Sequence, residues 1–401
     1  MTANASASET AVREAISEAI TTSDGVLATL VGVDGSAYRR PGAKMVITGE
    51  SERIGAITPG CLDEEIRTLA DAVRTAGEPR LERFDLTGDD DGWGVGVGCD
   101  GVIEVLLEPL DERIRPVVDA LETTEQHAVV TVLDADGTPF ERGERIVARQ
   151  DASGGETDEA NLTFESSSWP ESLERLLVEP ASELRASGAS ERLTLHWEGG
   201  TIEVFIDSLQ TPPELVVCGS HHDAVPVIEL ATRAGFRVTL VSFRGGVDTS
   251  RFAGADRVLT TAPNTLSAAL AFDADTYVVL LSHNFVDDRL ALDAVRETAV
   301  EYIGLVGSRG RFERMRDAFV AEGNPLDEAD RDRIYTPAGL DLGGDTPFHI
   351  AQSIVAEITA IHHDRTPAHL SEQQGSIHPR PALASKGDDD DRTAASERRS
   401  Q

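Results

Sequence analysis

The stretch LVVCGSHHDAVPVIELATRAGFRVTLVSFR, residues 215–244, decides the fold of this chain. It reads as an apolar strand, a turn that begins with glycine, an amphipathic helix and a second apolar strand. A strand, helix and strand of this length form a right-handed crossover between two parallel strands. We therefore expect a parallel sheet that extends beyond this unit.

The same alternation continues along the chain and predicts a Rossmann-like α/β domain over residues 213–365. Its parallel sheet should carry helices on both faces, and ligands in such folds lie at the carboxyl ends of the strands. The expected strands are 215–218, 236–242, 257–260, 276–282 and 302–306, and the expected helices are 223–234, 264–272, 288–299, 309–322 and one that begins at Pro347. The polar strand ends are Gly219 to His222, Ser242 to Arg244, Ser282 to Asn284 and Gly307 to Arg309, which includes Ser308.

Residues 1–110 show a different pattern, in which short strands and helices do not alternate regularly. This pattern predicts a smaller α+β domain at the N-terminus. The expected strands are 26–31 and 44–48, with strand character again over 81–108, and the expected helices are 9–22 and 62–76.

Residues 111–212 are less informative and read as a strand-rich connecting region with an acidic insertion. The polar run 152–168 is typical of such an insertion, which we extend to the residues around 135–170. Residues 366–401 read as a disordered acidic tail, and no internal repeat is evident.

Composition narrows the function classes. The 401 residues include 36 Lys and Arg against 71 Asp and Glu, for a formal net charge of −35. Such a surface repels nucleic-acid phosphates and anionic lipids, so neither is expected as a partner. The only lysines are Lys44 and Lys386. Excess acid with so little lysine suits a chain that folds in concentrated salt, where self-repulsion is screened, and we hypothesise a halophilic source.

The chain shows no signal for export, membrane insertion or a disulfide framework. Its first residues lack a basic start followed by an apolar block, and no run approaches the ~20 apolar residues of a membrane-spanning helix. The three cysteines are too few and too far apart for disulfides or a zinc site. We expect a cytoplasmic protein with free thiols.

The turn after the first Rossmann strand departs from a dinucleotide fingerprint. Gly219 stands at the first glycine position, but His221 and Ala224 replace the second and third. Ser242 stands where an acid would meet the ribose hydroxyls. Ordinary NAD binding is therefore not expected, although Arg244 could meet a 2′-phosphate or the phosphate of another nucleotide-like ligand.

The histidines at the strand ends have several readings. His221 and His222 either contribute to a ligand site or cap a helix and bond to backbone. Together with His283 they could also bind a metal, although no carboxylates are placed beside them. No catalytic triad can be assigned, because GSHH is not a nucleophile elbow.

Two of the thiols and one arginine pair are candidates for ligand contact. Cys61 follows Gly60 at the start of a helix, where the dipole favours a thiolate. Cys99 lies in a glycine-rich run. Each of these two thiols either contacts a ligand or packs against neighbouring side chains. Cys218 is expected in the core. The adjacent Arg39 and Arg40 could form an anion fork or remain exposed surface charges.

Several motifs together resemble the XdhC/CoxI family of accessory factors, which mature xanthine dehydrogenase-type and carbon monoxide dehydrogenase-type molybdoenzymes. The resemblance runs in order from residue 26 to residue 362. The motifs are GSAYRRPGAKMVIT (35–48), TPGCLDEEI (58–66), GWGVGVGCDGVIEVLLEPL (92–110), residues 215–244, LLSHNFVDDRLAL (280–292), YIGLVGSRGR (302–311) and PAGLDLGGDTPFHIAQSIVAEI (337–358).

This resemblance implies a cofactor-insertion chaperone rather than an enzyme. Such a factor binds the molybdenum cofactor, a molybdopterin with or without an attached nucleotide, and protects it while a cysteine desulfurase supplies the terminal sulfur. It then delivers the cofactor to the molybdenum hydroxylase apoenzyme. The positions that match the family are Cys61, Cys99, His222, Arg244, His283 and Asp288. We place Cys61 near molybdenum, which suits a soft thiolate, and the Rossmann strand ends near the phosphate.

Two other readings stay open. One is an NADP-linked oxidoreductase that uses the Rossmann-like domain, favoured by Arg244 and the Gly219 turn. The other is a scaffold that docks the dehydrogenase to its sulfur donor without holding cofactor. A homodimer would suit a carrier of a large ligand.

Overall fold

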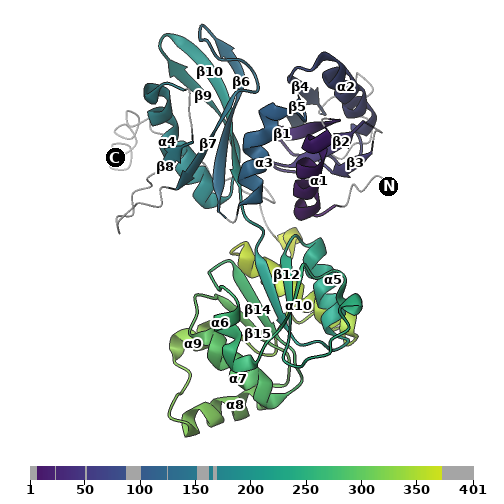
Figure 1. Ribbon diagram of the computed structural model, residues 1–401, viewed down its shortest axis with the longest axis vertical. Coiled ribbons are helices and arrows are strands. Elements are labelled where there is room, and N and C mark those ends of the chain that lie inside the picture. The colour runs from purple at the N-terminus through teal and green to yellow at the C-terminus, as the bar shows by residue number, and fades with distance from the viewer. Residues whose placement is uncertain are drawn as a thin grey trace, which may run out of the picture. The chain divides into compact units, whose positions relative to one another are not determined.

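The structure is a computed structural model that describes residues 7–22, 24–49, 52–86, 101–123, 125–150, 162–165 and 169–372. The chain divides into two compact units (Figure 1). One unit contains Val12–Thr211, and the other contains Pro212–Glu372 together with Ala7–Ala11. Most of the tail predicted from residue 366 lies outside the described residues.

The second unit is built on a six-stranded sheet in the order β13-β12-β11-β14-β15-β16. Every neighbouring pair in this sheet is parallel. This order is that of a Rossmann sheet, whose direction of winding reverses between β11 and β14. The strands are β11 (Glu214–Cys218), β12 (Arg237–Ser242), β13 (Arg257–Thr260), β14 (Thr276–Leu280), β15 (Tyr302–Leu305) and β16 (Ile334–Tyr335).

Helices cover both faces of this sheet, which confirms the predicted fold class. Leu215 and Val217 of β11 pack in one apolar cluster with residues of α5 and α10, whereas Val216 and Cys218 pack in another with residues of α6, α7 and α8. Alternate side chains of a strand point to opposite faces, so a doubly covered strand must be apolar throughout. The helices are α5 (Ala224–Arg233), α6 (Leu266–Ala269), α7 (Phe285–Arg296), α8 (Arg309–Ala321), α9 (Glu328–Asp332) and α10 (Pro347–His362).

Helix α7 begins at Phe285, earlier than the predicted residue 288, because Asn284 caps it. The Asn284 Oδ1 atom accepts hydrogen bonds from the backbone N–H groups of Val286 at 2.9 Å and Asp287 at 3.1 Å. An N-cap of this kind satisfies donors that have no partner inside the helix. The polar strand end from Ser282 to Asn284 therefore runs directly into a helix N-terminus.

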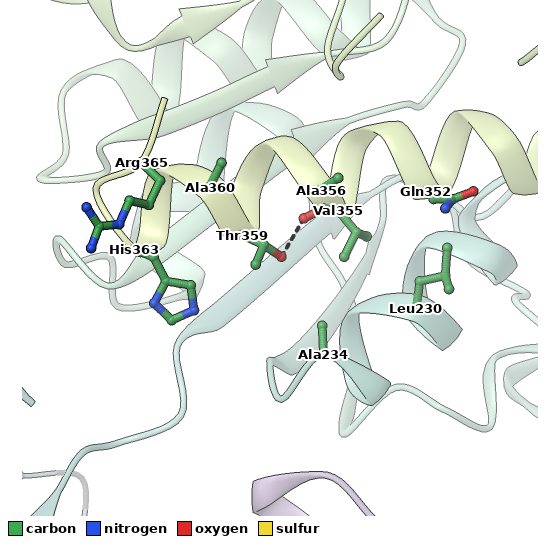
Figure 2. A pocket seen from close by; sticks show the side chains of 9 residues that line it. All are labelled: Leu230, Ala234, Gln352, Val355, Ala356, Thr359, Ala360, His363 and Arg365. Atoms are coloured by element: carbon green, nitrogen blue, oxygen red, sulfur yellow. Dashed lines mark hydrogen bonds between the residues drawn. The ribbon is translucent and has the colours of Figure 1, made fainter. Parts of the chain in front are cut away.

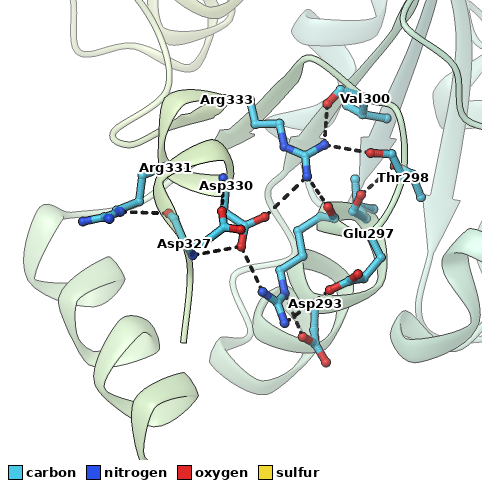
Figure 3. Close-up of polar contacts among 10 residues, drawn as sticks. Asp293, Glu297, Thr298, Val300, Asp327, Asp330, Arg331 and Arg333 are labelled. Carbon is cyan, nitrogen blue, oxygen red and sulfur yellow. Dashed lines mark hydrogen bonds and ion pairs between the residues drawn. The ribbon is translucent and has the colours of Figure 1, made fainter. Parts of the chain in front are cut away.

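Strand β16, which the sequence did not predict, is held by a buried ionic network (Figure 3). Arg296 Nη1 lies 2.9 Å from Asp330 Oδ2, and both side chains are almost fully buried. Arg333, which precedes β16, donates to the carbonyls of Thr298 at 2.8 Å and Val300 at 2.9 Å. These bonds fix the short strand at the edge of the sheet.

The first unit contains two five-stranded antiparallel sheets. Their orders are β3-β2-β1-β5-β4 and β8-β7-β6-β10-β9. The strands of the first sheet are β1 (Gly25–Gly35), β2 (Lys44–Thr48), β3 (Arg53–Gly55), β4 (Arg80–Asp85) and β5 (Gly101–Pro109). Those of the second are β6 (His127–Asp136), β7 (Arg145–Gln150), β8 (Leu162–Phe164), β9 (Glu191–Trp197) and β10 (Gly200–Leu209).

One amphipathic helix covers a face of each sheet. Helix α2 (Asp63–Ala76) buries Ile66, Ala70 and Val73 at helical spacing against the first sheet. Helix α4 (Glu171–Ser187) packs in the same way against the second. Two further helices, α1 (Glu9–Thr22) and α3 (Arg115–Glu122), precede β1 and β6.

The residues around 135–170, which the sequence predicts as an insertion, supply strands to the second sheet. Strand β7 pairs with β6, and β8 pairs with β7. Residues 151–161 and 166–168 lie outside the described residues. No helix in the described ranges has the length and apolar character needed to cross a bilayer.

Candidate functional site

The carboxyl edge of the Rossmann sheet begins with a turn that requires glycine. Gly219 directly follows β11 and has a φ of +145°. A Cβ atom there would lie 2.5 Å from the carbonyl oxygen of Leu281, which follows β14. The close approach of these two chain segments marks the point where the sheet reverses its winding, and ligands of this fold class bind in that crevice.

Two of the predicted histidines meet at this edge. The ring centroids of His221 and His283 are 5.3 Å apart. His283 has a left-handed backbone with φ of +56°, and its Nε2 atom lies 2.6 Å from Asp223 Oδ2. Left-handed backbone is uncommon for a residue other than glycine and often accompanies functional sites. His222 instead bonds through Nδ1 to Arg251 Nη2 at 3.0 Å.

The end of β12 carries hydroxyls in place of an acid. Ser242 is buried, and its Oγ atom donates to the carbonyl of Arg244 at 2.7 Å and lies 3.2 Å from Ser220 Oγ. Arg244 is 73% exposed and pairs with Asp287 at 3.2 Å. The guanidinium is therefore accessible to an anion, which would compete with Asp287.

Asp288 is fully buried and supports the edge rather than facing a ligand. It accepts hydrogen bonds from Ser282 Oγ at 2.5 Å and from Arg311 Nη2 at 2.6 Å. Arg311 also donates to the carbonyl of Val306 at 3.2 Å. Asp288 thus joins the chain segments that follow β14 and β15. It can affect a ligand only by positioning those two segments.

The two remaining predicted residues of this edge lie at the start of α8. Ser308 is the N-cap residue of α8, but its side chain makes no capping hydrogen bond. Ser308 and Arg309 are both exposed. A helix N-terminus with an adjacent arginine is suited to an anionic group.

In the first unit, Cys61 lies at a helix start. It is a half-buried free thiol, placed one residue before Leu62, the N-cap of α2. Gly60 before it has a φ of +118°. Acidic side chains in the first turn of α2 counteract the positive potential that the helix dipole creates near this thiol. One of them, Asp63, is paired with Arg53.

The arginine pair is connected to the Cys61 segment by a hydrogen bond. Arg39 Nη1 donates to the carbonyl of Ala56 at 3.3 Å, which links the loop between β1 and β2 to the connection between β3 and α2. Arg40 is exposed. The predicted contact Cys99 lies outside the described residues.

Cys218 is fully buried in the core, as expected. Burial and the nearby Asp288 carboxylate raise the pKa of its thiol, so it remains protonated and inert. Within the described ranges, no group of three or more His, Cys, Asp and Glu residues is arranged to hold a metal ion.

A groove of about 500 Å³ lies between α5 and α10 (Figure 2). Leu230, Ala234 and Val355 are among its largely apolar lining residues. Ala234 is the C-cap residue of α5 and lies just before β12 begins, so the groove lies at the amino ends of the strands. Because ligands of this fold bind at the opposite edge, we do not assign the groove as the functional site.

The structure thus forms two groups of predicted site residues, one in each unit. His221, His283 and Arg244 lie at the Rossmann edge, and Arg39 and Cys61 lie on connected segments of the first unit. Sequence reasoning missed Asp223, Arg251 and Arg311 as supporting partners, and it identified Ser282 only as part of a polar strand end. Their pairing depends on contacts between loops that are distant in sequence, so only Asp223, next to the histidines, offered a local signal.

These features define a protein with a Rossmann domain whose nucleotide turn is altered and which follows an antiparallel α+β unit. The chain belongs to the XdhC and CoxI family. A model of that family matches residues 21–85, and a model of the XdhC Rossmann domain matches residues 215–358.

Three known proteins illustrate the likeness. The chain is 28% identical over 341 residues to a Bacillus subtilis protein named as a probable xanthine dehydrogenase subunit, covering 84% of this chain and 92% of that one. It is 28% identical over 169 residues to "Uncharacterized protein YqeB" of Escherichia coli, covering 41% of this chain and 30% of that one. A crystal structure described as a xanthine dehydrogenase from Bacillus halodurans superposes with a TM-score of 0.65 at 25% identity, covering 88% of this chain and 96% of that one.

Proposed function

We propose that this chain is an accessory factor that binds the molybdenum cofactor as cargo, protects it during terminal sulfuration and delivers it to a xanthine dehydrogenase-type or carbon monoxide dehydrogenase-type apoenzyme. Its partners would be that apoenzyme and a cysteine desulfurase. Membership of the XdhC and CoxI family supports this proposal, as does the similarity to proteins named for xanthine dehydrogenase.

The observation that carries the proposal is the half-buried free thiol of Cys61 at the start of α2. A soft thiolate suits a sulfur-rich molybdenum centre better than oxygen ligands would. The loop that carries Arg39 and Arg40 is bonded to the same segment, and planar guanidinium groups are well suited to phosphate. This segment therefore offers groups for both ends of a molybdopterin.

The Rossmann edge would hold a phosphate or attached nucleotide in the second unit. Arg244 and Arg309 are exposed there beside helix N-termini, and His221 occupies the approach that a dinucleotide fingerprint keeps open with glycine. The proposal assigns each group a contact within its own unit and does not require them to form one site.

The test is the molybdenum and pterin content of protein purified anaerobically in high salt from cells that make the cofactor. Wild type, Cys61→Ser and the matched control Cys218→Ala would be compared. We expect molybdenum and pterin in wild type and in the control, and little in Cys61→Ser. Wild-type protein without molybdenum would refute the carrier, and full retention by Cys61→Ser would refute the role of the thiol.

An NADP-linked oxidoreductase remains the second candidate, because an arginine rather than an acid follows β12. Arg244 is exposed and accessible to a 2′-phosphate. Titration of NADPH fluorescence separates the two functions. Saturable binding that is lost in Arg244→Ala would support the enzyme, whereas no binding by a molybdenum-loaded protein would leave the carrier.

A further inference from the structure

The two sheets of the first unit have the same strand order and the same sequence of elements. Each has a helix before its first strand and another between its third and fourth strands. We propose that residues 12–110 (the first copy) and residues 115–209 (the second copy) are two copies of one module, of which only the first binds ligand. The second copy, its own site filled, holds the ligand loop of the first in place. This inference rests on the proposed function for the identity of the ligand.

The two copies share an irregularity that strand order alone does not require. In the pairing of β1 with β5, the register shifts so that Val31 is an extra residue. In the pairing of β6 with β10, the register shifts at the same place, and Leu133 is the extra residue. A bulge is a specific local feature that is retained within families, so its repetition indicates common descent of the two sheets.

Backbone contacts next to each bulge also repeat. Gly42 N donates to Leu30 O at 2.8 Å, and Gly143 N donates to Val132 O at 2.9 Å. Both glycines have positive φ, +97° and +89°. The connecting loops read VDGSAYRRPG over 33–42 and ADGTPFERG over 135–143, a likeness that argues against the expectation of no internal repeat.

Glycines at the far ends of the two sheets meet the same neighbours. A Cβ atom on Gly101, at the start of β5, would lie 2.6 Å from the carbonyl oxygen of Asp34. A Cβ atom on Gly200, at the start of β10, would lie 2.6 Å from the carbonyl oxygen of Asp136. Each glycine is therefore required by the same close backbone approach.

The copies pack against each other as the two halves of a two-fold dimer would. Lys44 Nζ of the first copy lies 2.6 Å from Asp207 Oδ2 of the second, and Arg145 of the second copy is paired with Glu108 of the first. By strand register Lys44 corresponds to Arg145, because each faces a buried threonine of the neighbouring strand. By the same register, Glu108 corresponds to Asp207. The same two positions therefore meet in both ion pairs, with the copies exchanged, which is the pattern of an isologous contact.

Apolar contacts between the copies follow the same symmetry. One buried cluster contains Val31 and Leu106 of the first copy and Leu133 and Phe205 of the second. Val31 and Leu133 are the bulge residues, while Leu106 and Phe205 face the equivalent threonines of β1 and β6. The cluster is thus formed by two equivalent pairs.

The symmetry ends where the ligand would bind. Trp169 lies one residue before the N-cap of α4, as Cys61 does before α2. Its ring centroid is 5.0 Å from that of Phe140, which in turn lies 5.8 Å from Trp197. These aromatic rings fill the second copy at the position that carries the thiol in the first. Tyr38, which corresponds to Phe140, is 61% exposed.

Each ion pair between the copies also anchors the base of one of these loops. Lys44 Nζ donates to the carbonyl of Gly42 at 3.0 Å, at the end of the loop that carries Arg39 and Arg40. Arg145 Nε donates to the carbonyl of Gly143 at 3.2 Å, at the end of the loop that carries Phe140. Asp207 is therefore a positioning residue for the arginine loop, whereas Glu108 positions the loop that binds nothing.

This symmetry supplies a matched pair of variants, Asp207→Asn and Glu108→Gln. Each removes one charge from an equivalent buried pair, so each should lower the thermal midpoint to a similar extent. Amide hydrogen exchange would report the loops directly. We expect Asp207→Asn to speed exchange at Gly42 by about tenfold with no change at Gly143, and Glu108→Gln to do the reverse.

Molybdenum content of the same proteins completes the test. We expect Asp207→Asn to lose most of its molybdenum and Glu108→Gln to keep it. Equal loss or equal retention by the two would overturn the proposal. If wild type holds no molybdenum, the proposed function fails, while the exchange result still decides whether each pair anchors its own loop. Should either variant fail to fold, a double variant provides the test. Lys44→Arg with Asp207→Glu places the ion pair of the second copy in the first copy. This protein must retain both slow exchange at Gly42 and molybdenum.

Discussion

The first and second copies of the N-terminal module agree at their shared interface and differ at their outer loops. At the interface, Lys44 with Asp207 and Arg145 with Glu108 form equivalent, almost fully buried pairs. At the loops, a half-buried thiol in one copy stands where a buried tryptophan stands in the other. The two copies have kept the interface contacts whose loss would destabilise the unit. A loop that does not bind ligand can instead accept large buried side chains such as tryptophan.

The largest effect should come from removing one partner of an interface pair. Glu108→Ala leaves Arg145 buried without its partner, and Asp207→Ala does the same to Lys44. Each should lower the free energy of unfolding by about 4 kcal/mol, because an uncompensated buried charge is strongly destabilising. Denaturant unfolding in concentrated KCl measures both losses. A large loss for one variant and a negligible loss for the other would break the proposed symmetry.

The next largest effect should distinguish the two loops. Trp169→Ala removes a buried ring that packs on Phe140, and it should cost about 3 kcal/mol. The equivalent change in the first copy, Cys61→Ala, should cost less than about 1 kcal/mol, because the thiol is small and half-buried. Thermal unfolding of the two variants provides the comparison. Similar losses would show that the position of Cys61 is as much a part of the core as that of Trp169.

A smaller effect concerns pH, to which the second copy contributes a buried histidine that the first copy lacks. Burial lowers the pKa of His127 at the start of β6, and Gly25 occupies the equivalent place in the first copy by register. The unfolded chain therefore binds a proton that the folded chain does not, so stability should fall as pH drops below about 6.5. The charged neighbours that modify this pKa are Glu125, Glu165, Arg149 and Arg185.

The variant His127→Gln should remove this part of the pH dependence, which one proton limits to about 1.4 kcal/mol per pH unit. The exposed His196 provides a control, since His196→Gln should keep the dependence of wild type. Unfolding curves between pH 5 and pH 8, taken as about the range in which histidine titrates, would measure the slopes. An unchanged slope in His127→Gln would assign the dependence to other groups.

The smallest effect is expected from salt on the interface pairs. The free energy of unfolding of the whole chain should rise with KCl, because a net charge of −35 repels itself. The coupling energy of Lys44 with Asp207, from a double-mutant cycle, should change by less than about 0.5 kcal/mol, since buried pairs are screened little. Stability in dilute buffer equal to that in molar KCl would contradict the hypothesis of a halophilic source.

The Rossmann unit could be predicted from sequence because each of its central strands is buried on both faces. Such strands are short apolar runs, and the helices between them show a clear period. The altered nucleotide turn was equally visible, since Gly219, His221 and Ser242 occupy positions that a known fingerprint defines. Strand β16 was not predicted, because it consists of two residues that depend on the Arg296 and Asp330 network.

The repeated module and the support of the site escaped sequence reasoning for a different reason. The two loops share a few residues, DG followed by an aromatic residue and an arginine, and they lie far apart in the chain. The register of the bulges and the contacts around them align the two loops, and these are visible only in the fold. Likewise, burial of Asp288 against Ser282 and Arg311 follows from packing between loops. A motif match identifies such an acid as a site residue but does not show whether it faces a ligand.

The most direct test of a carrier with one functional copy is the molar ratio of molybdenum to chain in the anaerobically purified wild-type protein. The account predicts about one molybdenum per chain at saturation, because a single copy keeps the thiol and the arginine loop. A ratio near two would contradict the assignment of the second copy as filled. Absence of molybdenum from protein made in cells that synthesise the cofactor would contradict the carrier function itself.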